Sequence, residues 1–106
     1  MCLVDFALGT DTCGSVRVPA SNCGIWGFRP SHGFISVAGV KPLAPTFDTV
    51  GILSRNAEVL TRVATVLLDC VSASAGQPAA IYLIREAFAL ADAELQQALT
   101  EPVRVL

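Results

Sequence analysis

The feature that most constrains this chain is a glycine-rich stretch, residues 9–33, in which a serine directly follows a glycine. Gly14 has no Cβ, so the backbone can turn sharply there and another group can approach closely. Ser15 on such a turn has an exposed hydroxyl beside backbone N–H groups, and Asp11 and Arg17 stand on either side as an ionisable pair. A nucleophile next to donors for a developing oxyanion is what acyl transfer requires. Spacing alone leaves open the ordinary alternative, a structural serine in a turn.

The same stretch resembles the amidase signature family, the serine amidases that use a Ser–cis-Ser–Lys triad. It reads GTDTCGSVRVPASNCG over residues 9–24 and GFRPS over residues 27–31, which matches the family pattern at nearly every fixed position. Residues 31–33 and 42–51 also follow the family, and the match is closer to the small plant-type and cyanobacterial amidases than to the amidotransferase branch. The resemblance implies an α/β fold, part of the amidase signature fold with helices flanking a mixed β-sheet, truncated at both ends.

By this resemblance, Ser15 is the acyl-enzyme nucleophile, and its own N–H contributes to the oxyanion hole. The other implied site residues are the backbone donors of the hole and the polar supports of the loop: Thr12, Cys13, Gly14, and Asp11 with Arg17. Cys13 departs from the family, which usually has glycine at this position. A side chain there narrows the approach to the hole, or shifts its backbone if that glycine used a positive φ.

A serine nucleophile needs a base, and the residues leave three alternatives. Lys41 is the only lysine, and Ser–Lys pairs are a known variant of the triad. His32 is the only histidine and could form a conventional triad with Ser15 and Asp11 or Asp48, although the resemblance gives it no catalytic role. In the family, the lysine and the cis-serine both lie upstream of the nucleophile. We therefore expect this chain to lack both, and a site without its base to lose several orders of magnitude in rate.

The composition is rich in core-forming residues. Apolar residues make up 53% of the 106 and charged residues only 15%, against about a quarter in ordinary soluble domains. The length allows one domain at most. This balance suits a piece of a larger α/β protein, so we interpret residues 1–106 as a partial amidase domain. Exposed apolar surface on the isolated chain would favour association.

Charge and targeting signals point away from several classes of partner. The net charge is −2 and the basic residues are scattered, which disfavours nucleic acid and anionic membranes. No apolar run reaches the roughly 18 residues of a membrane-spanning helix, and the first residues lack the charged segment of a signal peptide. We expect a cytoplasmic location, a small-molecule amide substrate and no cofactor. A homodimer of the full-length form is a further possible assembly.

The four cysteines form no CxxC pair, and a zinc site would need paired ligands at short spacing. We therefore expect no metal. Cysteines of this kind usually behave as small buried hydrophobes. Cys13 is the exception, because its place on the nucleophile loop could make it a reactive thiol.

Local patterns predict the elements of the first half. Alternating residues predict a strand over 3–8, and a second strand is predicted over 25–29. Between them, Pro19 suits the first turn of a short helix that Gly24 stops. Residues 31–51 are rich in Gly, Pro and Ser and predict an irregular segment with one short strand at 34–37.

Helices dominate the prediction for the second half. Asn56 should cap a helix whose apolar positions recur to Val71 with one buried face. The remaining predicted elements are a linker at 72–78, a strand at 81–84, a helix at 87–99 ended by Pro102, and a strand at 103–106.

Three classes of function follow. The first is an amide hydrolase of which this chain is the central part. The second is a non-catalytic amidase-like remnant or binding module, favoured by Cys13 and by the missing base. The third, a cysteine-based redox or metal protein, has Cys13 as its sole support.

Overall fold

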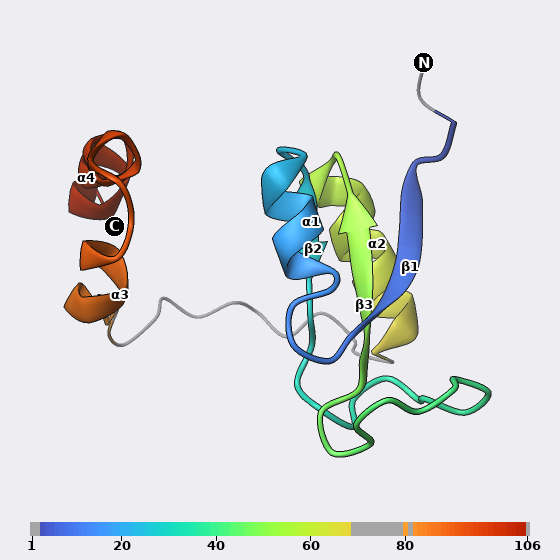
Figure 1. The fold of residues 1–106 in the computed structure, drawn as a ribbon. Helices are drawn as coiled ribbons and strands as arrows, with labels where there is room; N and C mark the ends of the chain where they lie inside the picture. The colour runs from blue at the N-terminus through green and yellow to red at the C-terminus, as the bar shows by residue number, and fades with distance from the viewer. Residues whose placement is uncertain (1–2, 69–79, 81, 106) are drawn as a thin grey trace. The chain divides into compact units, whose positions relative to one another are not determined.

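The computed structural model describes residues 3–68, 80 and 82–105, and the chain divides into two compact units, Met1–Ala73 and Ser74–Leu106. The elements in chain order are β1 (Phe6–Asp11), α1 (Arg17–Asn22), β2 (Trp26–Phe28), β3 (Thr49–Ser54), α2 (Ala57–Leu67), α3 (Arg85–Ala89) and α4 (Ala93–Val105) (Figure 1). The expected α/β class is confirmed.

The first unit is built on a three-stranded antiparallel sheet in the order β1-β3-β2 (Figure 1). On one side of β3, Phe6 pairs with Ser54 and Asp11 pairs with Thr49. On the other side, Trp26 also pairs with Ser54. This register brings the end of β1 and the start of β3 to the same end of the sheet, where the loop that carries Ser15, residues 12–16, begins.

Glycines allow α1 to pack closely against one face of this sheet. A Cβ on Gly27 would lie 2.5 Å from the Cβ of Ala20 in α1. A Cβ on Gly51 would lie 2.8 Å from the carbonyl oxygen of Phe28 and 3.2 Å from the side chain of Val16. Val16 and Ala20 are each only 1% exposed, so the start of α1 is fixed against the strands.

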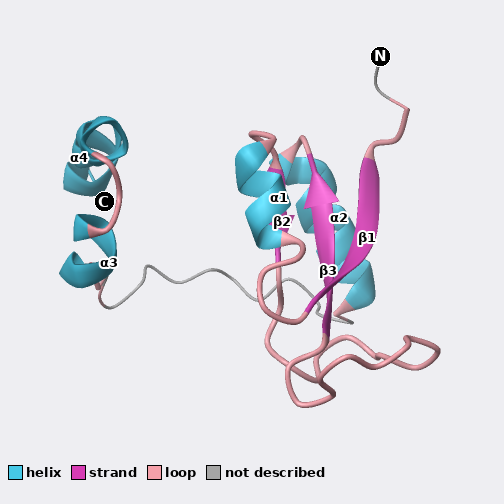
Figure 2. Cartoon of the chain, in the orientation of Figure 1, coloured by secondary structure: helices cyan, strands magenta, loops and turns pink. Residues whose placement is uncertain are grey.

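The opposite face carries Ile52, which is fully buried. Because side chains alternate across a strand, Ile52 points away from the face that Gly51 presents to α1. Helix α2 lies behind the sheet and α1 in front of it (Figure 2). The half-buried positions of α2 recur at helical spacing, as predicted: Val59, Leu60, Val63, Ala64 and Leu67.

The start of α2 confirms the predicted cap. The side-chain oxygen of Asn56 accepts hydrogen bonds from the N–H groups of Glu58 at 2.7 Å and Val59 at 3.4 Å. Two donors that have no partner inside the helix are thereby satisfied. The helix ends at Leu67, and the remainder of its predicted length, with the 72–78 linker, lies outside the described residues.

The strands differ from their predicted bounds. The first runs over Phe6–Asp11 rather than 3–8, because Gly9 belongs to the ladder, opposite Gly51, and not to the loop. Strand β3 lies in a region predicted in part to be irregular, since an interior glycine weakens a strand pattern. No strand forms at 34–37, where backbone bonds from Phe34 to Ser31 and from Val40 to Val37 make turns instead.

The short helix and the second strand are close to prediction. The helix starts at Arg17, so Pro19 lies in its first turn as predicted, and Gly24 follows its end with a φ of +63°. Strand β2 covers the middle three residues of the predicted five, from Trp26 to Phe28.

In the second unit, two helices replace the single predicted one. The break falls at Asp92, whose side chain accepts from the N–H of Leu95 at 2.8 Å and so begins a new helix. Pro102 does not end α4, because in the last turn it removes a single helical hydrogen bond. The strands predicted at 81–84 and 103–106 are wrong over 82–84 and 103–105, and Ile81 and Leu106 lie outside the described residues.

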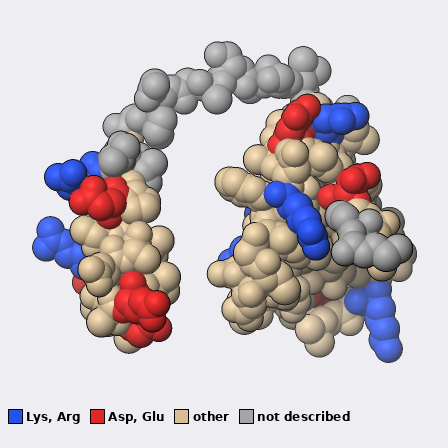
Figure 3. All heavy atoms as spheres, turned by 90° about the horizontal axis from the view of Figure 1, so that it is seen from above, with Lys and Arg blue, Asp and Glu red and all other residues tan. Residues whose placement is uncertain are grey.

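Charged side chains are scattered over the face seen in Figure 3, most of which consists of other residues. Large apolar side chains are correspondingly exposed, among them Phe6, Leu8, Trp26, Phe34 and Phe47. In the described ranges, no helix has the length and apolarity needed to cross a bilayer.

Candidate functional site

The loop between β1 and α1 is built around the carboxylate of Asp11, the last residue of β1. This side chain is fully buried and accepts three backbone N–H groups: Gly14 at 2.8 Å, Val16 at 3.2 Å and Arg17 at 3.2 Å. A carboxylate with several backbone donors fixes the path of the chain that wraps around it. The loop therefore has its shape before any substrate arrives.

Two arginines neutralise this buried charge. Arg17 donates from Nε to one Asp11 oxygen and from Nη2 to the other, both at 3.0 Å. Arg29 of the segment after β2 places its Nε 3.6 Å from Asp11 Oδ1. The hydrogen bonds from Arg17 lower the pKa of Asp11 far below its ordinary value and outweigh the opposing effect of burial. Asp11 in turn raises the pKa of Arg17. The sequence-based pairing of Asp11 with Arg17 is thus present in the structure.

The conformation of Gly14 brings Ser15 to the surface. Gly14 has a φ of +135°, and a Cβ there would lie 2.9 Å from Cγ2 of Val18, so a side chain is excluded both by the backbone angle and by space. Ser15 is exposed, and its hydroxyl has no hydrogen-bond partner among the described residues. Together with Cys13 and Pro19, these residues line an open hollow at the start of α1.

The expected oxyanion donors do not all face this hollow. The N–H of Gly14 is donated inward to Asp11. In the described part of the chain, the N–H groups of Thr12, Cys13 and Ser15 have no backbone or side-chain acceptor. The exposed thiol of Cys13 is free of any disulfide.

A second carboxylate reaches the loop from the start of β3. The hydroxyl of Thr12 donates to Oδ1 of Asp48 at 2.5 Å, across 36 residues of sequence. Asp48 also accepts the N–H groups of Leu43 and Ala44, at 2.8 Å and 3.0 Å from Oδ2. The bond from Thr12, with those backbone bonds, lowers the pKa of Asp48.

Arg29 is a site residue to which the sequence analysis assigned no role. Its Nε donates to the carbonyl oxygen of Asp11 at 3.3 Å, and its Nη2 donates to that of Phe47 at 2.8 Å. Arg29 therefore joins the ends of β1 and β2 to the segment before β3. The matched GFRPS run contains this arginine, but its partners lie 18 residues away in either direction.

Neither of the two candidate bases drawn from the sequence, His32 and Lys41, forms a hydrogen bond with Ser15 in the described part of the chain. His32 is exposed, and its Nε2 lies 3.0 Å from the carbonyl oxygen of Pro45. Lys41 is also exposed and forms no hydrogen bond with Ser15. The oxygens of Asp48 are occupied by Thr12 and the loop backbone, so the His32-based triad is not assembled.

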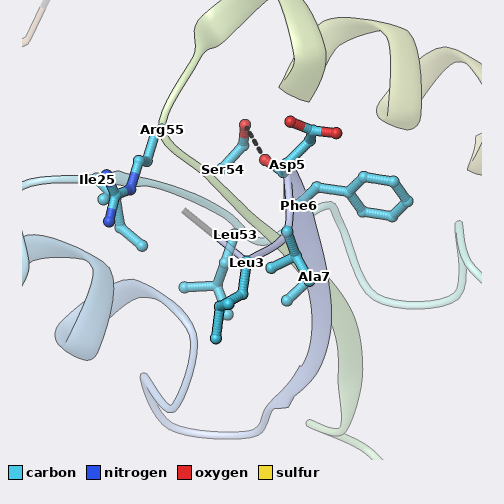
Figure 4. Close-up of a pocket in the computed structure, with 9 residues that line it drawn as sticks. Leu3, Asp5, Phe6, Ala7, Ile25, Leu53, Ser54 and Arg55 are labelled. Carbon is cyan, nitrogen blue, oxygen red and sulfur yellow. Dashed lines mark hydrogen bonds between the residues drawn. The ribbon is translucent and has the colours of Figure 1, made fainter. Parts of the chain in front are cut away.

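A separate hollow lies at the other end of the sheet. Leu3, Phe6, Ile25, Leu53 and Arg55 are among its lining residues, and Figure 4 shows the bond from the Ser54 hydroxyl to the Asp5 carbonyl beside it. The strand register puts this hollow at the opposite end of β3 from Asp48 and the nucleophile loop. It therefore forms no part of the candidate site.

Comparison with known proteins identifies close relatives. The family model described as Amidase matches residues 1–99. Amidase 1 of Arabidopsis thaliana is 51% identical over 88 residues, which are 83% of this chain and 21% of the relative. The chain thus spans about a fifth of the length of that relative. The predicted resemblance to plant-type amidases is confirmed.

Two further relatives carry other names. The Translocon at the outer membrane of chloroplasts 64 of Pisum sativum is 46% identical over 85 residues, 80% of this chain and 14% of the relative. A mitochondrial Glutamyl-tRNA(Gln) amidotransferase chain of Candida albicans (strain WO-1) is 54% identical over 65 residues, 61% of this chain and 14% of the relative. Names that point to organellar membranes contradict the default cytoplasmic location, and that prediction is wrong.

Proposed function

This chain belongs to the amidase family, and we propose that it carries the nucleophile loop of a serine amidase that hydrolyses a small carboxamide. Membership supports amide hydrolysis or amidotransfer at the level of the family. The observation that carries the finer proposal is the exposed, unbonded hydroxyl of Ser15 directly after Gly14, on a loop held by a buried carboxylate.

The proposed reaction begins with attack of the Ser15 oxygen on the carbonyl carbon of the amide. The carbonyl electrons move to its oxygen, and the N–H groups of Thr12, Cys13 and Ser15 are the proposed donors to that oxyanion. Collapse of the tetrahedral intermediate breaks the C–N bond, and the amine leaves with a proton. Water then releases the acid from the serine ester.

The proton of Ser15 has to go to a base outside the described contacts of the loop. The family resemblance implies a lysine acting through a cis-serine, both upstream of the nucleophile. Asp11 and Arg17 are proposed to support the loop, with no direct part in proton transfer. The inward N–H of Gly14 shapes the loop, which leaves Thr12, Cys13 and Ser15 as the proposed donors of the hole.

Serine-dependent hydrolysis is tested on the native protein at its natural length. We expect Ser15→Ala to lower p-nitroacetanilide hydrolysis by at least about a thousandfold, because the substitution removes the atom that forms the acyl-enzyme. A fluorophosphonate probe, which reacts with activated serines, should label the native protein and not the variant. The matched control is Ser21→Ala, an exposed serine of α1.

The alternative function is an amidase-like binding module. Two observations favour it: Cys13 in place of the usual glycine, and a 46% identical relative that is named as a translocon component. A native protein that neither hydrolyses the amide nor reacts with the fluorophosphonate would support this module and contradict the amidase proposal.

A further inference from the structure

We propose that Asp48 is a positioning residue for the nucleophile loop and acts through the hydroxyl of Thr12. The inference rests on the proposed role of Ser15 as nucleophile, and it adds the segment 43–48 to the machinery of the site. Asp48 touches no substrate in this proposal. Its function is to hold the backbone that presents the oxyanion donors.

The strand register carries the first step of the argument. Asp11 pairs with Thr49, so the next residue of one strand, Thr12, comes opposite the preceding residue of the other, Asp48. Their side chains meet in a 2.5 Å hydrogen bond, and Asp48 is only 5% exposed. The bond is therefore a consequence of the sheet, and solvent has little access to compete with it.

Asp48 is itself held in place. Its two oxygens accept the N–H groups of Leu43 and Ala44, which closes the segment 43–48 on itself. The carbonyl oxygen of Phe47, the residue before Asp48, accepts a hydrogen bond from Nη2 of Arg29 at 2.8 Å. This bond holds the same segment at a second point. A carboxylate with fixed partners can act as a rigid support for the residue that donates to it.

Because Thr12 precedes Cys13, the bond from Thr12 to Asp48 also limits the orientation of the Cys13 N–H. The peptide group between Thr12 and Cys13 carries the N–H of Cys13, which is one of the loop donors that have no acceptor in the described residues. The arginine-bound Asp11 fixes the chain on the other side of Thr12. With both residues held, that peptide group cannot rotate freely, and the Cys13 donor is preorganised for an oxyanion.

The test uses the native protein and a fluorophosphonate probe. In the labelling step the Ser15 oxygen forms a bond to phosphorus, the P–F bond breaks, fluoride leaves with the electron pair, and the serine proton passes to the base. The phosphoryl oxygen takes the place of the oxyanion. Saturation kinetics separate the maximal labelling rate from the probe concentration at half-saturation.

We expect Thr12→Val to lower the maximal labelling rate about tenfold to a hundredfold and to leave half-saturation within about threefold, because the substitution misplaces a donor and leaves binding intact. Thr12→Ser keeps the hydroxyl and should restore the rate. Thr65→Val is the matched control, since that hydroxyl bonds only to the Thr61 carbonyl in α2.

Asp48→Asn supplies the second variant, because Thr12→Val could unfold the loop. Asp48→Asn should lower the rate to a similar degree, and the double variant should fall no further than the lower of the two, which shows that both residues act through one contact. A thermal unfolding scan confirms that each variant is folded.

The outcomes separate the two proposals. If Ser15→Ala is unlabelled while folded Thr12→Val reacts at the native rate, or changes only half-saturation, the positioning role is overturned and the nucleophile stands. If Ser15→Ala is labelled like the native protein, or the native protein is unlabelled, the proposed function fails and the positioning role fails with it.

Discussion

At the scale of single residues, the charged carboxylate of Asp11 determines the shape of the loop, because it accepts the loop N–H groups and the Arg17 side chain. Hydrogen bonds from Arg17 lower its pKa in the folded protein below the ordinary value of about 3.9. A carboxyl group with a lowered folded pKa stabilises the native state above its unfolded pKa. That contribution is lost as pH falls below about 4 towards the folded pKa, because the unfolded chain then binds the proton first.

We therefore expect Asp11→Asn to lower the free energy of unfolding of the native protein by about 3 kcal/mol at pH 7, since it leaves arginines beside an uncharged buried group. The difference between the two proteins should shrink as the pH is lowered from about 5 to about 3. Urea unfolding at several pH values measures it. Glu101→Gln, which breaks the exposed pair with Arg104, should change stability by less than about 0.5 kcal/mol. An Asp11→Asn difference that stays constant with pH would contradict the argument.

At the scale of elements, the packing of α1 against the glycine face of the sheet determines where the loop that carries Ser15 ends. Ser15 and Val16 immediately precede α1, and Val16 is buried against that face. A displacement of α1 would therefore move the loop together with the helix.

Gly27→Ala tests this dependence. The new Cβ would lie 2.5 Å from that of Ala20, so we expect a loss of about 1–3 kcal/mol in unfolding free energy together with slower fluorophosphonate labelling of Ser15. Adding Ala20→Gly removes the opposing methyl group and should recover part of both losses. If the Gly27→Ala protein is folded and destabilised but Ser15 is labelled at the native rate, the packing of α1 does not control the position of the Ser15 loop, and the argument is contradicted.

Elements with local signals were predictable from the sequence, and those that depend on distant partners were not. The cap at Asn56 involves atoms two and three residues away and was correctly predicted. Strand β3 was missed because an interior glycine weakens a strand pattern. The reason for a glycine at position 51 is distant in sequence, since a side chain there would meet Val16 and Phe28.

The same reasoning applies to the candidate site. Asp11, Arg17 and the exposed Ser15 lie within seven consecutive positions, 11–17, and the motif pointed to all three. The bond from Thr12 to Asp48 crosses 36 residues, and the contacts of Arg29 with Asp11 and Phe47 each cross 18, so they follow from strand register and not from any local pattern.

At the scale of the whole molecule, the described residues expose many large apolar side chains. Phe34 and Phe47 are each at least 60% exposed, and Leu8 and Trp26 at least 50%. Large exposed apolar surfaces of this kind favour association. The sequence composition predicted this property without saying where the surface would lie.

We expect the 106-residue polypeptide to self-associate and to bind a dye specific for exposed apolar surface. Size-exclusion chromatography and dye fluorescence measure the two properties. A monomeric isolated chain that unfolds cooperatively and binds no dye would contradict this expectation.

The contacts of Asp11 also limit where protons can travel in the site. Its two oxygens offer about four lone-pair positions. Five N–H donors already point at them: those of Gly14 and Val16, and three from Arg17. No acceptor capacity remains for a proton from Ser15, although Asp11 precedes it by only four residues. We therefore expect Asp11 to keep its negative charge during the proposed reaction, because its role is to fix the shape of the loop and not to transfer a proton.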